Sequence, residues 1–246
     1  MIETYYVGTY WGTRRESSEE CARRGQVFFE AMARCDPFFG RWFKAPPSRT
    51  SPHPQAHALD IPTLQELFVQ GQNHNDEGRI IEDLGFRIIV DNGKWPGTRQ
   101  REFSSLSIRC GAYAESSGPN SCVLNLPSAG ASMEHVIRAP MLANILRAMV
   151  MAWDPERGIA TSHAHRDLVT ERGIVGTFVG WLMYFPRQLG SVPPLPPPVQ
   201  VEPIEGRGTL VILTPERFTA SNPEHVALAA RAHETLSQAG LLQPLS

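Results

Sequence analysis

The sequence predicts an α+β fold in which helices pack on a mainly antiparallel sheet. Residues 106–112 and 122–126 alternate apolar and polar side chains on either side of a turn-forming segment, as two paired strands do. Residues 17–35 and 140–153 instead place apolar side chains every three or four positions, as helices lying on a sheet do. No internal repeat or linker-like composition divides the chain, so we expect residues 1–246 to form a single domain.

The first third of the chain predicts a strand, a long helix and a loop. Residues 5–11 are rich in aromatic and β-branched side chains, which favours a strand. Ser17 and Glu20 have the spacing of a capping box, and the helix that they open is expected to end before Pro37. Five prolines interrupt residues 45–62, which we interpret as a surface loop.

Shorter patterns lie between that loop and the two paired strands. Apolar residues at 64–68 and again at 80–84 indicate short helical segments, each ending in a glycine, and a strand is expected at 86–90. Residues 91–93 have the composition of a turn. Pro140 then opens the second long helix, which should stop at Asp154.

The last third predicts three further strands and a closing helix. We expect strands at 159–161, 177–185 and 209–213, the last in a central position, with glycines at 173–180 allowing bends. The proline-rich segment 193–198 is expected to be a stiff surface connection between two strands, although a polyproline ligand is an alternative. Asn222 should cap a final helix whose buried face is expected to comprise Val226, Ala229, Ala230 and His233.

Composition excludes several classes of function. Lys plus Arg number 23 and Asp plus Glu number 25, so the net charge of −2 gives no overall field that would attract nucleic acid or an anionic membrane. No secretory signal or membrane-spanning apolar stretch is recognisable. We therefore expect a cytoplasmic protein, and we interpret its four cysteines as core residues.

A search for catalytic chemistry identifies one weak candidate. His163 and His165 are two residues apart, so on a strand they would point to the same side and could share a metal ion beside Asp167. No further His or Cys pair has metal-ligand spacing, and neither a nucleophile motif nor a phosphate-binding loop is present. We therefore interpret residues 162–167 as a polar loop, and we predict no catalytic residue, no bound metal and no cofactor.

One segment is strongly acidic. Residues 60–91 contain seven carboxylates and two arginines, which gives this segment a net charge of −5. A protein that binds a basic partner would carry such a surface, although an ordinary solvated surface explains it equally well. The carboxylates are Asp60, Glu66, Asp76, Glu77, Glu82, Asp83 and Asp91.

Several short blocks, in the same order along nearly the full length, resemble the immunity protein 52 family of bacterial polymorphic toxin systems. The blocks are GTYWG at 8–12 with ECA at 20–22, LGF at 84–86, SIRCGAY at 107–113, AWDP at 152–155, VGWL at 179–182, and TPERF at 214–218 leading into NPEH at 222–225. The resemblance rests on the order of the blocks along the chain.

The resemblance implies a cytoplasmic immunity protein that protects the producing cell by binding a cognate toxin, often a restriction-endonuclease-like nuclease. It transfers no catalytic or toxin-binding residue. A carboxylate surface could occupy the basic cleft of a nuclease, and a buried aromatic anchor would tighten the complex. The alternative is a small metal-dependent hydrolase built on His163, His165 and Asp167. The candidate toxin-binding residues are Asp76, Glu77, Glu82, Asp83, Asp91, Trp95 and Trp11, although Trp11 could instead pack in the core.

Overall fold

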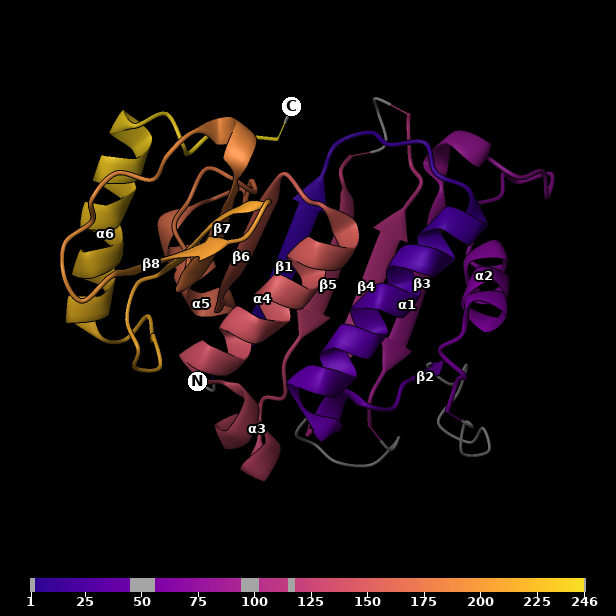
Figure 1. Cartoon of the computed structure of the whole chain (residues 1–246), viewed down its shortest axis with the longest axis horizontal. Helices are drawn as coiled ribbons and strands as arrows, with labels where there is room; N and C mark the ends of the chain where they lie inside the picture. The colour runs from indigo at the N-terminus through magenta and orange to yellow at the C-terminus, as the bar shows by residue number, and fades with distance from the viewer. Residues whose placement is uncertain (1–2, 45–55, 94–101, 115–117, 246) are drawn as a thin grey trace.

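The computed structural model describes residues 3–44, 56–93, 102–114 and 118–245. Within these ranges nine strands form one sheet in the order β2-β3-β4-β5-β1-β6-β7-β9-β8, and all neighbouring strands are antiparallel. The predicted α+β class is therefore confirmed (Figure 1). The strands are β1 (Tyr5–Trp11), β2 (Phe43–Lys44), β3 (Phe86–Asp91), β4 (Ser105–Cys110), β5 (Asn120–Asn125), β6 (Arg157–Ser162), β7 (Leu182–Pro186), β8 (Gln200–Ile204) and β9 (Gly208–Ile212).

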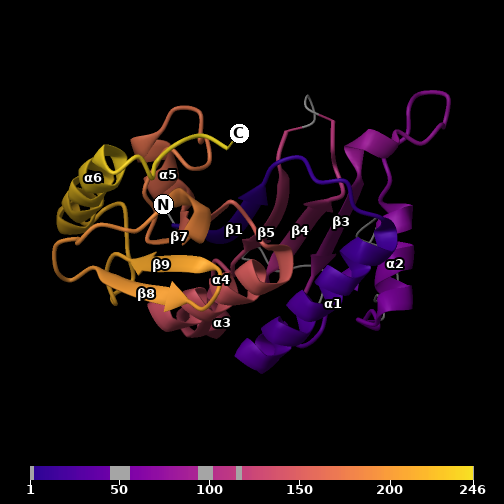
Figure 2. The ribbon, with the colours of Figure 1, turned by 45° about the horizontal axis from the view of Figure 1, so that its top comes forward.

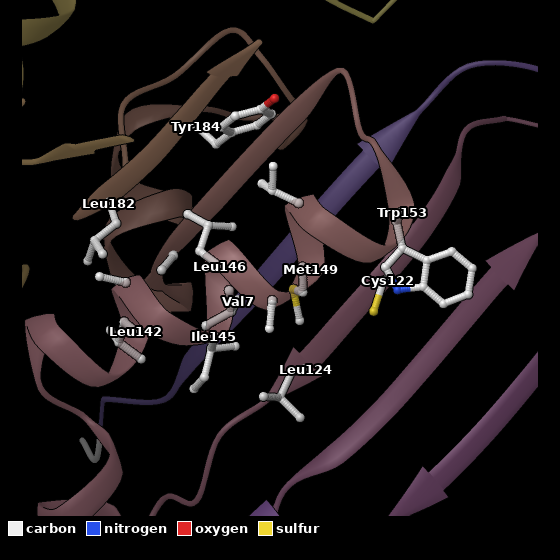
Figure 3. Close-up of a cluster of buried hydrophobic side chains, with 14 of the residues drawn as sticks. Val7, Cys122, Leu124, Leu142, Ile145, Leu146, Met149, Trp153, Leu182 and Tyr184 are labelled. Atoms are coloured by element: carbon white, nitrogen blue, oxygen red, sulfur yellow. The ribbon is translucent and has the colours of Figure 1, made fainter. Parts of the chain in front are cut away.

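Two long helices, α1 (Ser18–Cys35) and α4 (Ala139–Trp153), lie side by side over one face of the sheet (Figure 1). The other helices are α2 (Ile61–Gln70), α3 (Gly130–Val136), α5 (His163–Val169) and α6 (Pro223–Gln238). Figure 3 shows Ile145 and Met149 of α4 packed toward Val7 of β1 and Leu124 of β5, and all four side chains are fully buried. This cluster joins the helices to the centre of the sheet.

The two halves of the sheet differ in how they are covered. Along β4 and β5 buried side chains alternate with partly exposed ones, so only the face under the helices is closed. Every residue of β6 and β7 is buried, because these strands are covered on both faces. Figures 1 and 2 show no helix over the face of β3, β4 and β5 that points away from α1, within the part of the chain that is described.

Local sequence signals set the ends of the long helices as predicted. Ser17 and Glu20 form the full capping box at the start of α1. In α4 Pro140 occupies the first turn, and Asp154 ends the helix in a left-handed conformation with φ 50°. The two strands expected at 106–112 and 122–126 pair antiparallel as β4 and β5, with Ile108 opposite Cys122.

Several local predictions are wrong. The segment 80–84 forms only a short 3₁₀ helix, η2 (Glu82–Leu84), because Ile80 pairs with His74 in an isolated bridge. The strand expected at 177–185 is restricted to β7, and its glycine-rich first part is a loop. Strand β9 is next to the edge of the sheet and not central.

Two predictions about helices also need correction. Residues 163–167 belong to α5 and not to a polar loop, because the Ser162 side chain caps a helix there. In α6 the buried face is shifted by one residue, since His225, Leu228, Ala229, Ala232 and Leu236 are buried, whereas Ala230 and His233 are exposed.

Among the helices of the described ranges, none has on its own the length and apolar composition needed to cross a membrane. Only α3 and α4 taken together meet both conditions, across a bend of 75°. The residues of α4 are largely buried under the sheet, as those of a core helix are.

The Asn120 side chain links the end of β5 to the segments after β1 and β4 by hydrogen bonds. Its amide Nδ2 donates to the carbonyl oxygens of Gly12 at 2.7 Å and Ala112 at 3.0 Å, and its Oδ1 accepts from the Ala112 N–H at 3.0 Å. The side chain is fully buried, so no water replaces these bonds when they are lost.

We expect Asn120→Ala to lower the free energy of unfolding by about 2–3 kcal/mol, because it leaves buried backbone groups without partners. Asn125→Ala at the other end of β5, where the side chain is partly exposed, is the control and should cost less than about 0.5 kcal/mol. Urea denaturation measures both values. Equal losses in the two variants would contradict the role assigned to Asn120.

Candidate functional site

Between α2 and β3 the chain makes a narrow hairpin-like excursion that we call the acidic excursion (residues 72–84). Backbone N–H groups of Asn75 and Ile81 donate to the carbonyls of Arg79 and Asn73, at 2.9 and 2.8 Å. The Asn75 side chain closes the turn, since its Oδ1 accepts from the N–H of Glu77 at 3.1 Å and of Arg79 at 2.8 Å. Side-chain and backbone bonds together therefore hold the turn in a fixed shape.

The acidic excursion forms one wall of a groove, and the loop between β1 and α1 forms the other. The groove has a volume of about 460 Å³. Its lining residues come from the β1–α1 loop, the start of α1, the excursion, the start of β3 and the segment after β4: Arg15, Glu16, Ser17, Glu20, Gln72, Ile80, Glu82, Phe86, Gly111 and Tyr113. Apolar and charged side chains thus meet in the same groove.

The carboxylates around the groove differ in how free they are to meet a partner. Glu20 accepts from the Ser17 backbone N–H and hydroxyl at 2.7 and 2.8 Å, and these bonds lower its pKa. Glu77 is paired with Arg79 at 2.8 Å. Glu82 and Asp76 are exposed and have no ion pair among the described residues, so they are the most available carboxylates.

The structure separates the predicted acidic residues into an exposed and a buried group. Asp76, Glu77 and Glu82 are exposed, and Asp83 is partly exposed, so all four can contribute to the charge of this surface. Asp91 is only 7% exposed at the end of β3. We therefore withdraw Asp91 from the candidate binding set.

The two tryptophans proposed as anchors have different outcomes. Trp11 is 2% exposed and stacks on Trp153 with ring centroids 5.5 Å apart, so it belongs to the core and cannot serve as an exposed anchor. Trp95 lies outside the described residues. Its role in binding stays a prediction.

The groove contains side chains that sequence reasoning missed. Ile80 is 49% exposed, although its neighbours had suggested a buried helical face. Arg15 lies over the ring of Tyr113 at 5.0 Å and holds that ring at the groove. No signal in the sequence predicted this exposure, because Ile81 and Leu84 give Ile80 the apolar neighbours of a helical face.

The histidines of the alternative metal site lie on a helix and point to different partners. His165 is fully buried, its Nε2 lies 3.0 Å from the Val179 carbonyl oxygen, and its ring packs on Phe218. His163 instead packs on Tyr6. Residues two apart on a helix diverge, so the strand geometry that suggested a shared metal ion does not apply. No group of three potential metal ligands occurs among the residues that are described.

Comparison with known proteins identifies one family. The model of the family described as immunity protein 52 matches residues 3–245, which is nearly the whole chain. No curated protein matches. A solved structure described as "Pseudomonas aeruginosa T6SS protein PA0821" is similar in fold, with a TM-score of 0.54 and 11% identity over 95% of this chain and 76% of that chain.

The burial of His165 predicts a pH dependence of stability. Burial lowers the pKa of His165 below its usual value of 6.5, although the hydrogen bond to the Val179 carbonyl acts in the opposite direction. The unfolded chain therefore binds a proton at this site more readily than the folded chain does, and stability present above about pH 6.5 is lost as the pH falls below it.

We expect His165→Gln, which can still donate to the Val179 carbonyl, to show a weaker loss of stability between about pH 6.5 and 5 than the parent chain. The measurement is urea denaturation across this range. His233→Gln on the exposed side of α6 serves as the control and should keep the parent profile. Identical profiles for all three proteins would show that His165 is not responsible.

Proposed function

The chain belongs to the immunity protein 52 family, and on that premise we propose that it protects a bacterial cell by binding and neutralising a cognate toxin. The fold similarity to a T6SS protein supports a place in the same kind of system. The observation that carries the proposal furthest is the acidic groove beside residues 72–84. The available carboxylate of Glu82 and the exposed side chain of Ile80 line it together, as charge and apolar surface do in a docking site for a basic partner.

We propose further that the toxin is a restriction-endonuclease-like nuclease, as the family resemblance implies. A nuclease needs Lys and Arg around its cleft to hold phosphates, and the carboxylates of Asp76 and Glu82 can attract the same groups. Charge of this kind mainly accelerates the encounter of the two proteins. The whole chain carries a net charge of only −2. Attraction of a basic partner therefore depends on the carboxylates that are concentrated in this segment.

Tight binding needs a desolvated anchor in addition to charge. Ile80 and Tyr113 provide apolar surface in the groove, and the Arg15 guanidinium limits the freedom of the Tyr113 ring. A side chain that is already ordered loses less entropy when a partner buries it. Trp95 stays a candidate for a second anchor.

We assign no catalytic residue, cofactor or metal to this chain, and we propose a single domain that works in the cytoplasm. The hydrolase alternative required His163 and His165 to share a metal ion, and their separate partners do not favour it. All four cysteines are free thiols, which suits a reducing compartment. A protein that acts by occupying its partner needs no reaction centre of its own.

The proposal is tested by neutralising the acidic surface. The quadruple variant combines Asp76→Asn, Glu77→Gln, Glu82→Gln and Asp83→Asn. Its association rate with the toxin encoded beside this gene should fall by at least about tenfold at low ionic strength. Its dissociation rate should change less, and its free energy of unfolding should stay within about 0.5 kcal/mol of the parent value. Stopped-flow mixing at low and high salt measures association.

A matched control neutralises four exposed carboxylates elsewhere: Glu30→Gln, Glu171→Gln, Glu205→Gln and Glu234→Gln. It changes the net charge by the same amount and should associate at nearly the parent rate. If both quadruple variants slow equally, only net charge matters and the groove is not the docking site. If the toxin neither co-purifies with the parent protein nor loses toxicity on co-expression, the proposed function is wrong.

The apolar contribution of the groove is tested separately. Ile80→Asp and Tyr113→Ala should each raise the dissociation rate of the toxin complex about tenfold, because each removes buried contact area at the centre of the groove. Ile174→Asp changes another exposed isoleucine, in the loop after α5, and is the control. Surface plasmon resonance with an inactive toxin variant gives both rates. Unchanged dissociation in the groove variants would exclude Ile80 and Tyr113 as anchors.

A further inference from the structure

Two buried histidines contact the ring of Phe218 where α6 is attached, and we call His165, Phe218 and His225 the histidine cluster. The His165 ring meets the Phe218 ring edge-on, with centroids 4.7 Å apart, and the His225 ring stacks on it at 5.2 Å. His165 and Phe218 are fully buried, and His225 is only 9% exposed. The cluster therefore joins α5, α6 and the segment that precedes α6.

The hydrogen bonds of His165 suit only its neutral form. Its Nε2 lies 3.0 Å from the Val179 carbonyl oxygen, and because a carbonyl can only accept, Nε2 carries the hydrogen. Its Nδ1 is buried and has no hydrogen-bond partner among the described residues. A second proton would therefore place an N–H donor in the core without an acceptor, which is costly.

The hydrogen bond of His225 also requires an unprotonated nitrogen. Its Nδ1 accepts from the backbone N–H of Thr219 at 3.1 Å, and because a backbone N–H can only donate, Nδ1 carries a lone pair. A proton on this nitrogen would remove the bond and bring two donors together. This bond holds the first turn of α6 to the segment before it, so its loss would loosen the helix.

The charge of Glu3 acts on the cluster but does not supply a partner for a second proton. Its Oε1 already accepts from the Ser162 hydroxyl and, at 2.9 Å, from the Ala220 N–H. Burial lowers the pKa of His165, whereas the Val179 hydrogen bond and the charge of Glu3 act in the opposite direction. The net direction is downward, so the folded chain keeps this ring neutral.

The other ionisable side chains on the surrounding elements are paired, partly exposed or exposed. Within the described ranges neither buried histidine forms a hydrogen bond or ion pair with any of them. Tyr5 donates its hydroxyl to the Phe218 carbonyl at 2.7 Å and stays uncharged, since burial raises its pKa. The remaining groups are the pairs Arg217–Glu134 and Arg166–Asp167, the partly exposed His163, and the exposed Glu171, Arg172, Glu216, Glu224, Arg231, His233 and Glu234.

The position of α6 allows it to open separately from the rest of the fold. Figures 1 and 2 show α6 beside α5 at one end of the molecule, away from α1 and α2. The cluster of α4 side chains around Val7 lies between these ends (Figure 3). Local openings of this kind involve the elements that share the fewest contacts with the core.

We propose that the histidine cluster is an acid-sensitive contact, and that a second proton on His165 or His225 releases α6 and residues 214–222 from α5 while the rest of the fold stays closed. The open state takes up the proton more readily than the closed state, so acid favours opening. The effect begins near pH 6.5, the usual pKa of histidine, and grows as the pH falls. This proposal does not depend on toxin binding, since α2, which leads into the acidic excursion, lies at the opposite end of the molecule from α6 (Figure 1).

The test is amide hydrogen exchange of the full-length protein, expressed as protection factors that correct for the intrinsic effect of pH. Each histidine that is neutral in the closed state and protonates in the open state raises the opening constant by up to about tenfold at about pH 5.5. Protection of the α6 amides should therefore fall by about tenfold or more between about pH 7.5 and about pH 5.5. It should also be nearly independent of low urea concentrations, as in a local opening, whereas exchange of the α4 amides should depend on urea.

Non-titrating variants assign the effect to the two rings. His165→Gln keeps a donor for the Val179 carbonyl, and His225→Asn keeps an acceptor for the Thr219 N–H. Each should reduce the loss of α6 protection, and the double variant should hold protection within about twofold over the same pH range. His233→Gln on the exposed side of α6 is the matched control and should lose protection as the parent does.

Two results would overturn the proposal. One is a double variant, shown to be folded by circular dichroism, that loses α6 protection as the parent does. The other is found in the parent protein alone: α6 amides with the same protection and urea dependence as α4 amides at about pH 5.5 would show that α6 does not open separately. This second comparison decides the question even where the double variant does not fold.

Discussion

The loop between β1 and α1 is held against the end of α4 by two arginines that share one buried carboxylate. Glu16 lies 3.1 Å from Arg14 and 2.5 Å from Arg24. The same arginines donate to the carbonyl oxygens of Trp153 and Ala152, at 2.8 and 3.0 Å. Cations are favourable at a helix C-terminus, where carbonyl groups lack partners. Removing the carboxylate would leave two arginine charges facing each other, so the three side chains form one unit. Both the position of α1 and one wall of the acidic groove depend on this unit of three side chains.

Uneven coverage of the sheet determines where a partner can bind. Both faces of β6 and β7 are closed, and Phe178 packs with Tyr6 and Ile159 on the side away from α4. Among the described residues, β4 and β5 alternate buried and partly exposed side chains, so their side away from α1 is partly open. A sheet packed on one face gives polar side chains defined positions without requiring a loop to hold them.

Charged side chains near the start of β3 lie on two different surfaces. Glu82 of the acidic excursion lines the groove, whereas Arg87 follows Phe86 on the strand and therefore lies on the opposite face. A partner can then be recognised by the position of charge as well as by its sign. For an immunity protein this property matters, because it has to recognise one toxin and leave other basic proteins unbound.

The sequence by itself determined the elements whose signals are local. The capping box of Ser17, the proline that opens α4 and the alternation of β4 and β5 all depend on neighbouring residues, so the periodicity and the caps predicted them. It also determined the family, through short blocks in a constant order, and the acidity of the segment before β3. Tertiary structure decided the rest. Ile80 is exposed, Trp11 stacks on Trp153 and α6 buries a shifted face, since each depends on which distant element packs against it. The opposition of Arg87 and Arg109 likewise arises only when two strands pair in one register, and residues 22 positions apart in the sequence give no sign of it.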